Sequence, residues 1–449
     1  MSKKIAAIVM ALTLAASLTA CGSLTGKTTG SAAAASTASS TQETSIATGS
    51  VSGSVTSEEP IASVGEEEAS QEEMSVSAGS ESAQEEVVTV ANVTSGGVID
   101  ASDLFSSRDL RQTADLSEAV YYTVEDGQTI TINAAGVYVL SGSAENCTIV
   151  VEAGDEDKVQ LVLDGLSITN EDFPAIYVKN ADKVFVTTTA GSENELSVTG
   201  SFTNDGDTNT DAVIFSRDDL VLNGLGTLTV SSTENGISCK DDLKITGGTL
   251  YISCVEDALE ANDSISIADG VINIATYKDG LHSENDEDAT QGTVYICGGE
   301  LNISAGDDGI HGTSYVQIDG GTVNVSAAEG IEGTYIQING GDVTIEASDD
   351  GINAARKSSV STPTVEINDG NITITMGQGD TDGIDSNGNL IINGGTIDVT
   401  GQSPFDYDGT AEYNGGTLIV NGSQTNSITN QMMGGGMGGF GGGPGGGRR

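Results

Sequence analysis

The sequence predicts an all-β protein whose short strands wind into a right-handed parallel β-helix with about three strands per coil. Glycine supplies 60 of the 449 residues, whereas aromatic side chains make up only 4% and Trp is absent. Glycine pairs recur at intervals of 20 to 29 residues, and short segments of alternating apolar and polar residues flank them. This combination is typical of many short strands joined by tight turns, and it argues against a helical bundle.

The repeat is built on Gly-Gly or Asp-Gly pairs. Their second glycines are Gly248, Gly270, Gly299, Gly321, Gly341, Gly370, Gly395 and Gly416. An alternating segment follows each pair, as at 249–252, and another precedes it, as at 243–245. A third apolar position follows an acidic-glycine step, as in Asp308-Gly309-Ile310. Alternation with a period of two gives each strand one buried face.

These three strands fit into coils of about 21 residues, which leaves no room for crossover helices. The chain must therefore coil, and each turn pairs in parallel register with the next, so that inward Ile, Val and Leu form a continuous core. An antiparallel sandwich is the rival architecture, but its turns would not recur in fixed register with the same residues.

The N-terminus reads as a lipoprotein signal peptide over residues 1–20. Lys3 and Lys4 precede a short apolar run, which ends in Leu-Thr-Ala-Cys with Cys21 as the last residue. The run is too short to span a membrane. The pattern predicts lipidation of Cys21 and an extracytoplasmic protein anchored to the bacterial membrane at the cell surface, and several acyl chains would hold it firmly. An ordinary secretion signal with an incidental Cys is the alternative.

The composition divides the remaining chain into three parts. Residues 21–100 are rich in Ser, Thr, Ala and Glu and predict a disordered linker, because such a segment cannot bury enough apolar area to offset its ordering entropy. Residues 101–428 form the predicted β-helix, and residues 429–449 form a Gly- and Met-rich tail that is also disordered by composition. The net charge of −50 excludes nucleic acid as a partner and favours cations. We expect a monomer.

The cysteines other than Cys21 show no zinc-binding spacing. Cys147, Cys239, Cys254 and Cys297 contain no CxxC pair, and three of them lie within strand-like repeats. Buried free thiols are expected, and a disulfide between neighbouring coils is the alternative.

Aligning the coils on their glycine pairs brings acidic residues into columns. One column runs Asn235, Asp257, Asp279, Asp308, Glu329, Asp350 and Asp382; a second runs Glu234, Glu256, Lys278, Asp307, Ala328, Asp349 and Thr381; a third runs Ser238, Glu260, His282, His311, Glu332, Asn353 and Asp385. A further stack holds Asp218, Asp241 and Asp263. Coils lie about 4.8 Å apart. Two carboxylates at that distance repel by about 3.5 kcal/mol at an effective dielectric of 20.

Such repulsion is relieved by shared protons or by a bound cation. Ca²⁺ prefers clusters of oxygen ligands and is available outside the cell. The candidate calcium ligands are Glu256, Asp257, Asp279, Asp307, Asp308, Glu329, Asp349, Asp350, Asp382 and Asp385. The alternative is that Asp-Gly only supplies turns, since these are the commonest turn residues.

Four residues are candidates for contact with a bound ligand. Glu260 and Glu332 belong to the third column, and Tyr315 and Tyr335 align in adjacent coils, where they could form a strip for stacking against sugars. A tyrosine ladder that only covers the sheet is the alternative. The aligned His282 and His311 are not favoured as a metal-binding pair.

The region from Gly136 onward resembles a bacterial carbohydrate-binding domain family that was once known only as a domain of unknown function. The resemblance rests on GVYVLSGSAENCTIVVEAGDEDKVQLVLDGLSITNEDFPAIYVKNADKVFV, SRDDLVLNGLGTLTV and SCKDDLKITGGTL, and it covers most of residues 101–425. It implies a secreted or lipidated β-helix that binds cellulose or polygalacturonate and is similar in fold to calcium-dependent pectate lyases. It also implies Ca²⁺ at the acidic turn positions, here the Asp-Gly and Glu-Asp steps.

We therefore expect a calcium-dependent polysaccharide-binding protein whose partner is pectin-like or cellulose. An enzyme is not expected, because a lyase of this fold needs a Lys or Arg base, and neither Lys278 nor Lys240 stands in a recognisable proton-abstraction motif. The alternatives are an adhesin or structural β-helix without a specific glycan and, less favoured, a calcium-dependent polysaccharide lyase.

Overall fold

The computed structural model describes residues 86–89, 97–379 and 381–430. The chain divides into two units, Met1–Gly79 and Ser80–Arg449, and all described residues belong to the second. The predicted signal peptide, Cys21, the linker up to residue 85 and the tail from residue 431 lie outside the described residues. In the described part of the chain, no helix is long and apolar enough to cross a membrane.

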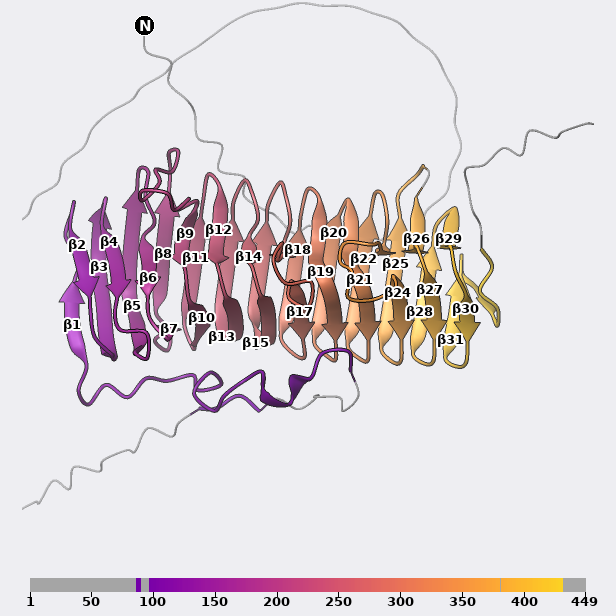
Figure 1. Ribbon diagram of the computed structural model, residues 1–449, viewed down its shortest axis with the longest axis horizontal. Helices are drawn as coiled ribbons and strands as arrows, with labels where there is room; N and C mark the ends of the chain where they lie inside the picture. Colours follow the sequence, from indigo (N-terminus) through magenta and orange to yellow (C-terminus); the bar gives the residue numbers. More distant parts are fainter. Residues whose placement is uncertain (1–85, 90–96, 380, 431–449) are drawn as a thin grey trace, which may run out of the picture. The chain divides into compact units, whose positions relative to one another are not determined.

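The second unit is all-β, and its strands stack in one row from β1 to β31 (Figure 1). Each strand pairs with the equivalent strands of the preceding and following coils. Among the described strands, every pairing is parallel except that of β31 with β32 at the C-terminal end. The expected all-β architecture with coiled parallel strands is therefore confirmed. The one helical segment in this part of the chain is the 3-10 turn η1 (Ala101–Asp103).

Each coil crosses three faces. The first face, called the site face, consists of β2 (Thr129–Ile132), β4 (Thr148–Glu152), β6 (Ile176–Asn180), β9 (Ala212–Ser216), β12 (Asn235–Cys239), β14 (Leu259–Ala261), β16 (Leu281–Ser283), β23 (Ile352–Ala354), β26 (Asp382–Ser386) and β29 (Ser403–Tyr407). The second, called the strap face, consists of β1 (Val120–Thr123), β7 (Lys183–Thr188), β10 (Asp219–Gly224), β17 (Thr293–Ile296), β24 (Thr364–Ile367), β27 (Asn389–Ile392) and β30 (Ala411–Tyr413).

The third face consists of β8 (Glu193–Val198), β11 (Thr227–Ser231), β18 (Glu300–Ser304), β20 (Thr322–Ala327), β22 (Asp342–Ala347), β25 (Asn371–Met376), β28 (Thr396–Thr400) and β31 (Thr417–Val420), with β32 (Ser423–Thr425) at its end. Longer strands bend around corners. Those from the strap face to the third face are β3 (Gly136–Glu145), β5 (Lys158–Asn170), β13 (Asp242–Ser253) and β15 (Ser264–Ala275). Those from the site face to the strap face are β19 (Asp308–Ile318) and β21 (Glu329–Ile338).

The core is a set of stacked apolar columns. On the site face one column reads Ile237, Leu259, Leu281, Ile310, Ile331, Ile352, Ile384 and Phe405, paired in register from coil to coil. Each of these side chains is at most 2% exposed. Because side chains alternate along a strand, the residue after each core member points outward. The outward column is therefore the third column of the sequence analysis.

Glycine is needed at two different places in the coil. The glycines that end each pair adopt positive φ, as at Gly248 (84°) and Gly270 (117°), which L side chains rarely adopt. The glycine after each acid serves close packing instead. A β-carbon on Gly309 would lie 2.6 Å from the carbonyl oxygen of Gly330, and one on Gly330 would lie 2.3 Å from that of Gly351. The Asp-Gly step is thus a point of close contact between coils as well as a bend.

Residues 97–119, called the strap, run along the strap face against the direction of coiling (Figure 1). The amides of Val98 and Ile99 donate to Gln337 and Gln317, while Gln112 bonds to Thr246. Apolar strap side chains, Ile99, Leu104, Phe105 and Leu110, pack on Ala268, Tyr295 and Cys297. The strap thereby covers outward apolar groups that would otherwise meet water.

The four described cysteines are free and buried, as expected. Burial raises the pKa of the Cys254 and Cys297 thiols to about 11, so both remain protonated at neutral pH.

Candidate functional site

The third column forms a continuous outward row on the site face. Ser238, Glu260, His282, His311, Glu332, Asn353 and Asp385 pair in this order from β12 to β26, and the row continues to Asp406 on β29. The predicted alignment is therefore confirmed. The sequence analysis missed Asp406, although it directly follows a core residue, Phe405, as Asp385 follows Ile384.

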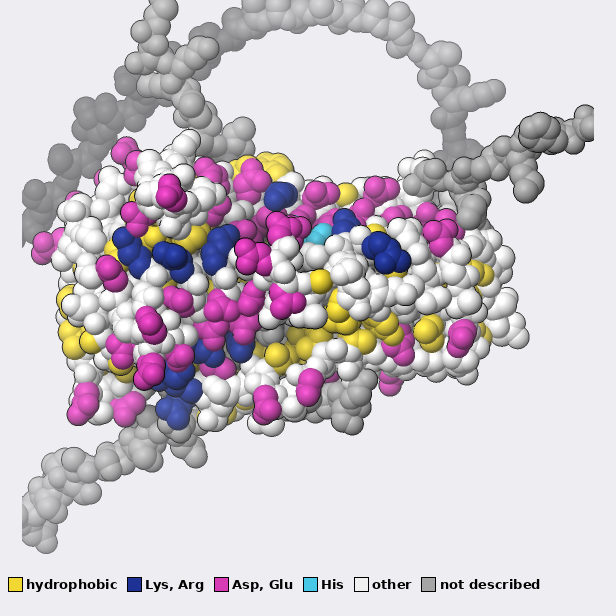
Figure 2. Space-filling model, viewed as in Figure 1, with side chains coloured by type: hydrophobic (Ala, Val, Ile, Leu, Met, Phe, Trp, Pro, Cys, Tyr) yellow, Lys and Arg dark blue, Asp and Glu magenta, His cyan; other side chains and the backbone are white. Residues whose placement is uncertain are grey.

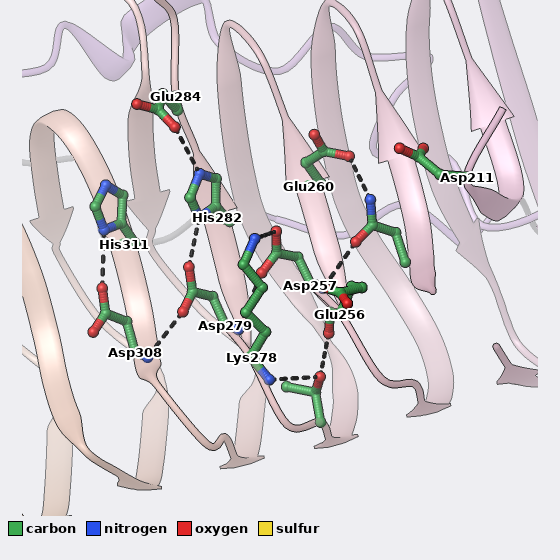
Figure 3. A network of polar contacts seen from close by, with 12 residues as sticks. Asp211, Glu256, Asp257, Glu260, Lys278, Asp279, His282, Glu284, Asp308 and His311 are labelled. Carbon is green, nitrogen blue, oxygen red and sulfur yellow. Dashed lines mark hydrogen bonds and ion pairs between the residues drawn. The ribbon is translucent and has the colours of Figure 1, made fainter. Parts of the chain in front are cut away.

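The first column lies at the corner before this row, and its acids are largely buried. Asp257, Asp279 and Asp308 are 4%, 4% and 7% exposed. Each accepts or donates along the column: the Asp279 amide lies 3.1 Å from Asp257 Oδ1, and the Asp308 amide lies 2.9 Å from Asp279 Oδ1 (Figure 3). Asn235 begins the ladder by accepting from the Asp257 amide at 2.9 Å. One oxygen of Asp257 and one of Asp279 thus accept from a backbone amide, and the second oxygen of each remains for another partner.

We call the first and third columns together the acid row. In its middle segment, from Asp257 to Glu332, basic side chains reach the acids. Lys278 Nζ lies 2.9 Å from Asp257 Oδ2, and Lys240 Nζ lies 3.0 Å from Glu260 Oε1. Burial opposes ionisation of Glu260, but the attraction of Lys240 and the hydrogen bonds of Ser238 and Lys240 lower its pKa overall. Figure 2 shows this mixture of acidic side chains with Lys, Arg and His on the visible face.

Two histidines also contact acids of the middle segment. The rings of His282 and His311 stack at 4.8 Å between centroids, with 6° between their planes. His282 Nδ1 lies 2.5 Å from Asp279 Oδ2 (Figure 3). His311 Nδ1 lies 2.9 Å from both Asp308 Oδ2 and Glu332 Oε2. Lys357, from a loop with no periodic signal in the sequence, lies 2.7 Å from Glu332 Oε1.

The C-terminal cluster, defined as Asp350, Asp382, Asp385 and Asp406, has a different environment. Burial raises the pKa of Asp350 to about 6 and that of Asp385 to about 7, and neighbouring acids push both in the same direction. Within the described residues, no ion pair with Lys, Arg or His reaches Asp350, Asp385 or Asp406. The charges of Asp350, Asp385 and Asp406 are therefore not balanced by ion pairs with basic side chains of the described residues.

Neutral oxygens without a partner adjoin this cluster. Asn353 is 9% exposed and lies in register between Glu332 and Asp385. Its Nδ2 donates to Glu329 and Glu332, which leaves Oδ1 on the side of Asp385. Three buried oxygens have no hydrogen-bond partner among the described residues: Asn353 Oδ1, Thr381 Oγ1 and Asp406 Oδ1. Such buried oxygens are available to bond to water or to a cation.

The other predicted ligands are placed differently. Glu256, Asp307 and Asp349 of the second column are exposed to solvent. Glu329 is half-buried; burial raises its pKa to about 7, and its Oε2 accepts from Asn353 at 2.9 Å. The structure therefore brings the first and third columns together, and leaves Glu256, Asp307 and Asp349 of the second column exposed to solvent.

Tyr315 and Tyr335 pair in register but do not form a flat strip. Their ring centroids lie 6.3 Å apart with 53° between the planes. Both follow the corner of their strands, so they lie on the strap face, and the Tyr335 hydroxyl bonds to Glu366 at 2.7 Å. They are therefore separated from Glu260 and Glu332 by the corner.

A polar hollow of about 540 Å³ opens beside His282 on the site face. Its lining includes Lys240, Glu260, Asn262, His282, Glu284 and Asn285. This volume lies within the range of about 300–1,000 Å³ found for small-molecule sites. Glu260 is the one predicted ligand-contact residue in this hollow.

The coiled parallel strands and the outward row of ionisable side chains define an all-β protein with an extended charged face. The chain belongs to the family of carbohydrate-binding domain-containing proteins, whose sequence model matches residues 126–381 and 328–427. A relative of the same description, from Acetivibrio thermocellus, is 40% identical over 122 residues, which are 26% of this chain and 43% of that protein. The chain therefore spans less than half of that relative.

A solved structure is also similar. It is described as the polysaccharide lyase-like protein from C. thermocellum, as a gadolinium derivative. It is 31% identical, and the match covers 52% of this chain and 95% of that chain with a TM-score of 0.44.

Proposed function

We propose that this chain is a calcium-dependent polysaccharide-binding protein of the bacterial cell surface, held to the membrane through a lipid on Cys21. Its partner is an acidic pectin-like glycan such as polygalacturonate, or cellulose, and it acts as a monomer without catalysis. Family membership supports glycan binding. The coil is proposed to be right-handed, the hand that twisted parallel strands favour.

The observation that carries the calcium requirement is the C-terminal cluster. Asp350, Asp385 and Asp406 have no ion pair with a basic side chain among the described residues, and Asn353 and Thr381 add neutral oxygens. A set of carboxylate, amide and hydroxyl oxygens is the chemistry that Ca²⁺ prefers. Asp350, Asp385 and Asp406 would hold the ion with Asn353. Bound Ca²⁺ would supply positive charge for the carboxylates of an acidic glycan.

Two lysines that contact acids of the acid row, Lys278 and Lys357, support binding without catalysis. Burial opposes their charge, but ion pairs with Asp257 and Glu332 raise the pKa of Lys278 and Lys357 overall. A lysine that abstracts a proton must be neutral, so its pKa has to be lowered toward the working pH. These two lysines are shifted in the opposite direction.

The test is retention of the purified chain, from residue 86 onward and without its lipid, on immobilised polygalacturonate and on cellulose, in Ca²⁺ and in a calcium chelator. We expect retention in Ca²⁺ and its loss on chelation. The change Asp350→Asn with Asp385→Asn should abolish retention, while Tyr315→Phe serves as a matched control on another face. Retention that is unchanged by the chelator would refute the proposal that Ca²⁺ links the protein to the glycan. Absorbance from unsaturated uronate would instead establish a lyase, and no retention on any glycan would favour an adhesin.

A further inference from the structure

We infer that Asp308, His311 and Glu332 form a second metal site, which binds a divalent transition-metal ion such as Zn²⁺. Asp308 and His311 come from β19, and Glu332 comes from the next coil in β21. The site lies in the middle segment of the acid row, apart from the C-terminal cluster proposed for Ca²⁺. It goes beyond the proposed function, because nothing in glycan binding requires it.

The convergence of the three side chains on one point carries the inference. His311 Nδ1 lies 2.9 Å from Asp308 Oδ2 and 2.9 Å from Glu332 Oε2. The three ligand atoms all lie within 4.8 Å of one another, and the three residues are 7%, 8% and 4% exposed. Nδ1 carries at most one hydrogen, so it cannot donate a well-directed hydrogen bond to two carboxylates at once.

A metal ion resolves this competition. Zn–N and Zn–O bonds are about 2.0–2.2 Å long, so adjacent ligands of a tetrahedral ion lie about 3.3–3.6 Å apart. The two contacts of 2.9 Å made by His311 Nδ1 would therefore lengthen by about 0.5 Å on binding the ion. The ion would replace the shared proton and bond to all three atoms.

The surrounding groups hold these ligands in place. Lys357 Nζ bonds to Glu332 Oε1 at 2.7 Å, which leaves Oε2 for the ion. The Asp308 amide bonds to Asp279 Oδ1 at 2.9 Å, and this fixes the start of β19. The His282 ring stacks on His311 at 4.8 Å, and Asp279, His282 and His311 form a second convergent group. Such outer partners are typical of metal sites, where they orient the ligands.

The donor set selects the kind of ion. An imidazole nitrogen with two carboxylates suits Zn²⁺ and related transition metals, whereas Ca²⁺ takes oxygen ligands. The C-terminal cluster supplies only oxygens. The acid row would therefore hold two chemically different ions at separate positions. The competing account has no metal, and a protonated His311 imidazolium joins the two carboxylates.

The experiment titrates the chain from residue 86 onward, freed of metal by chelation and dialysis, with Zn²⁺ by calorimetry and with Co²⁺ by visible absorption. We expect one Zn²⁺ per chain at this site, and a loss of affinity of at least about 100-fold on His311→Gln. The matched control is Asp350→Asn with Asp385→Asn, which should change Zn²⁺ affinity by less than about threefold.

Two measurements on the unaltered chain test the inference if His311→Gln does not fold. Co²⁺ should give d–d bands of nitrogen and oxygen ligands, and a thiolate-to-cobalt band would overturn the assignment by placing the metal on a cysteine. Nitrogen NMR of the histidines at pH 8 should show loss of the Nδ1 proton of His311 on addition of Zn²⁺. Two protonated nitrogens that persist at saturating Zn²⁺ would establish the ion-pair account instead. Glycan retention in Ca²⁺ should be the same with and without Zn²⁺, so failure of either proposal can be recognised separately.

Discussion

The middle segment and the C-terminal cluster of the acid row differ in how the charges of their stacked carboxylates are compensated. Between Asp257 and Glu332, lysines and histidines lie within 2.5–3.0 Å of the acids. In the C-terminal cluster, no ion pair with a basic side chain reaches Asp350, Asp385 or Asp406 among the described residues. Burial and neighbouring acids raise the pKa values of Asp350 and Asp385, as they raise that of Glu329 in the middle segment. The comparison teaches that a column of stacked acids does not by itself define a calcium site. We infer that the counter-charges from neighbouring columns and loops determine which of the two regions requires Ca²⁺ to balance its carboxylates.

Removal of the C-terminal cluster should have the largest effect on calcium. We expect Asp350→Asn with Asp385→Asn to weaken Ca²⁺ binding by at least about 100-fold, or about 2.7 kcal/mol, because two charged ligands are lost. Calorimetric titration with Ca²⁺ measures this loss.

The matched control is Asp257→Asn in the middle segment, which keeps the Oδ1 that accepts from Asp279. It should leave Ca²⁺ affinity within about threefold of the unaltered chain. Equal losses in both variants would mean that the two regions do not differ, and the comparison would fail.

The second effect is a dependence of Ca²⁺ affinity on pH. Protons compete with Ca²⁺ for Asp385, whose pKa is about 7 without the ion, and for Asp350, whose pKa is about 6. Affinity should therefore fall by about tenfold or more between pH 8 and pH 6. Titrations across this range in a constant ionic strength measure the slope, and an affinity that is flat from pH 8 to pH 6 would contradict the raised pKa values.

In the calcium-free chain, Asp385 and Glu260 should contribute opposite slopes to the dependence of the unfolding free energy on pH. Asp385 has a raised pKa, so the folded state holds its proton more tightly, and this contribution to stability is lost as pH rises from about 4 to about 7. Glu260 has a lowered pKa, so its contribution is present above pH 4–5 and is lost as pH falls through its folded pKa. Asp385→Asn should remove the first slope, and Glu260→Gln should remove the second. Denaturant unfolding at several pH values distinguishes them.

The smallest effect is expected at the ion pair of Lys278 with Asp257. Lys278→Gln leaves the buried Asp257 carboxylate without its counter-charge and should cost about 1–2 kcal/mol, which is reduced because the lysine side chain is 45% exposed. Adding Asp257→Asn should recover most of that loss. Denaturant unfolding measures both variants. If the double variant is no more stable than Lys278→Gln alone, the loss of stability does not come from the unpaired charge of Asp257.

The sequence predicted the coiled fold and the columns because both follow from spacing. The glycine pairs set the register, so residues such as His282 and His311 could be placed side by side without a structure. The ladder at Asp257, Asp279 and Asp308 could not be predicted in the same way. It depends on which oxygen of each acid faces the amide of the next coil. The sequence pattern could not predict the basic partners of the acids either, because Lys357, which pairs with Glu332, comes from an irregular loop.

The strap was also outside the reach of periodicity. Residues 97–119 show no repeat, and their contacts with Gln317 and Gln337 are set by chain direction along the strap face. Apolar residues such as Tyr295 stand where alternation predicts an outward side chain. That exception was the one signal that another segment would cover the sheet.

The strap changes how the coils depend on one another during unfolding. In a repeat array, each coil contacts only its neighbours, so the ends can unravel independently of the centre. The hydrogen bond from Val98 to Gln337, 239 residues apart, connects the start of the strap to a distant coil. The coils along the strap should therefore open together. The coils after Gln337 lie beyond the described contacts of the strap, and the C-terminal cluster is among them. Without Ca²⁺, backbone amides should therefore exchange fastest in this C-terminal end. A bound Ca²⁺ ion would couple neighbouring coils there, as the strap couples the coils that it contacts.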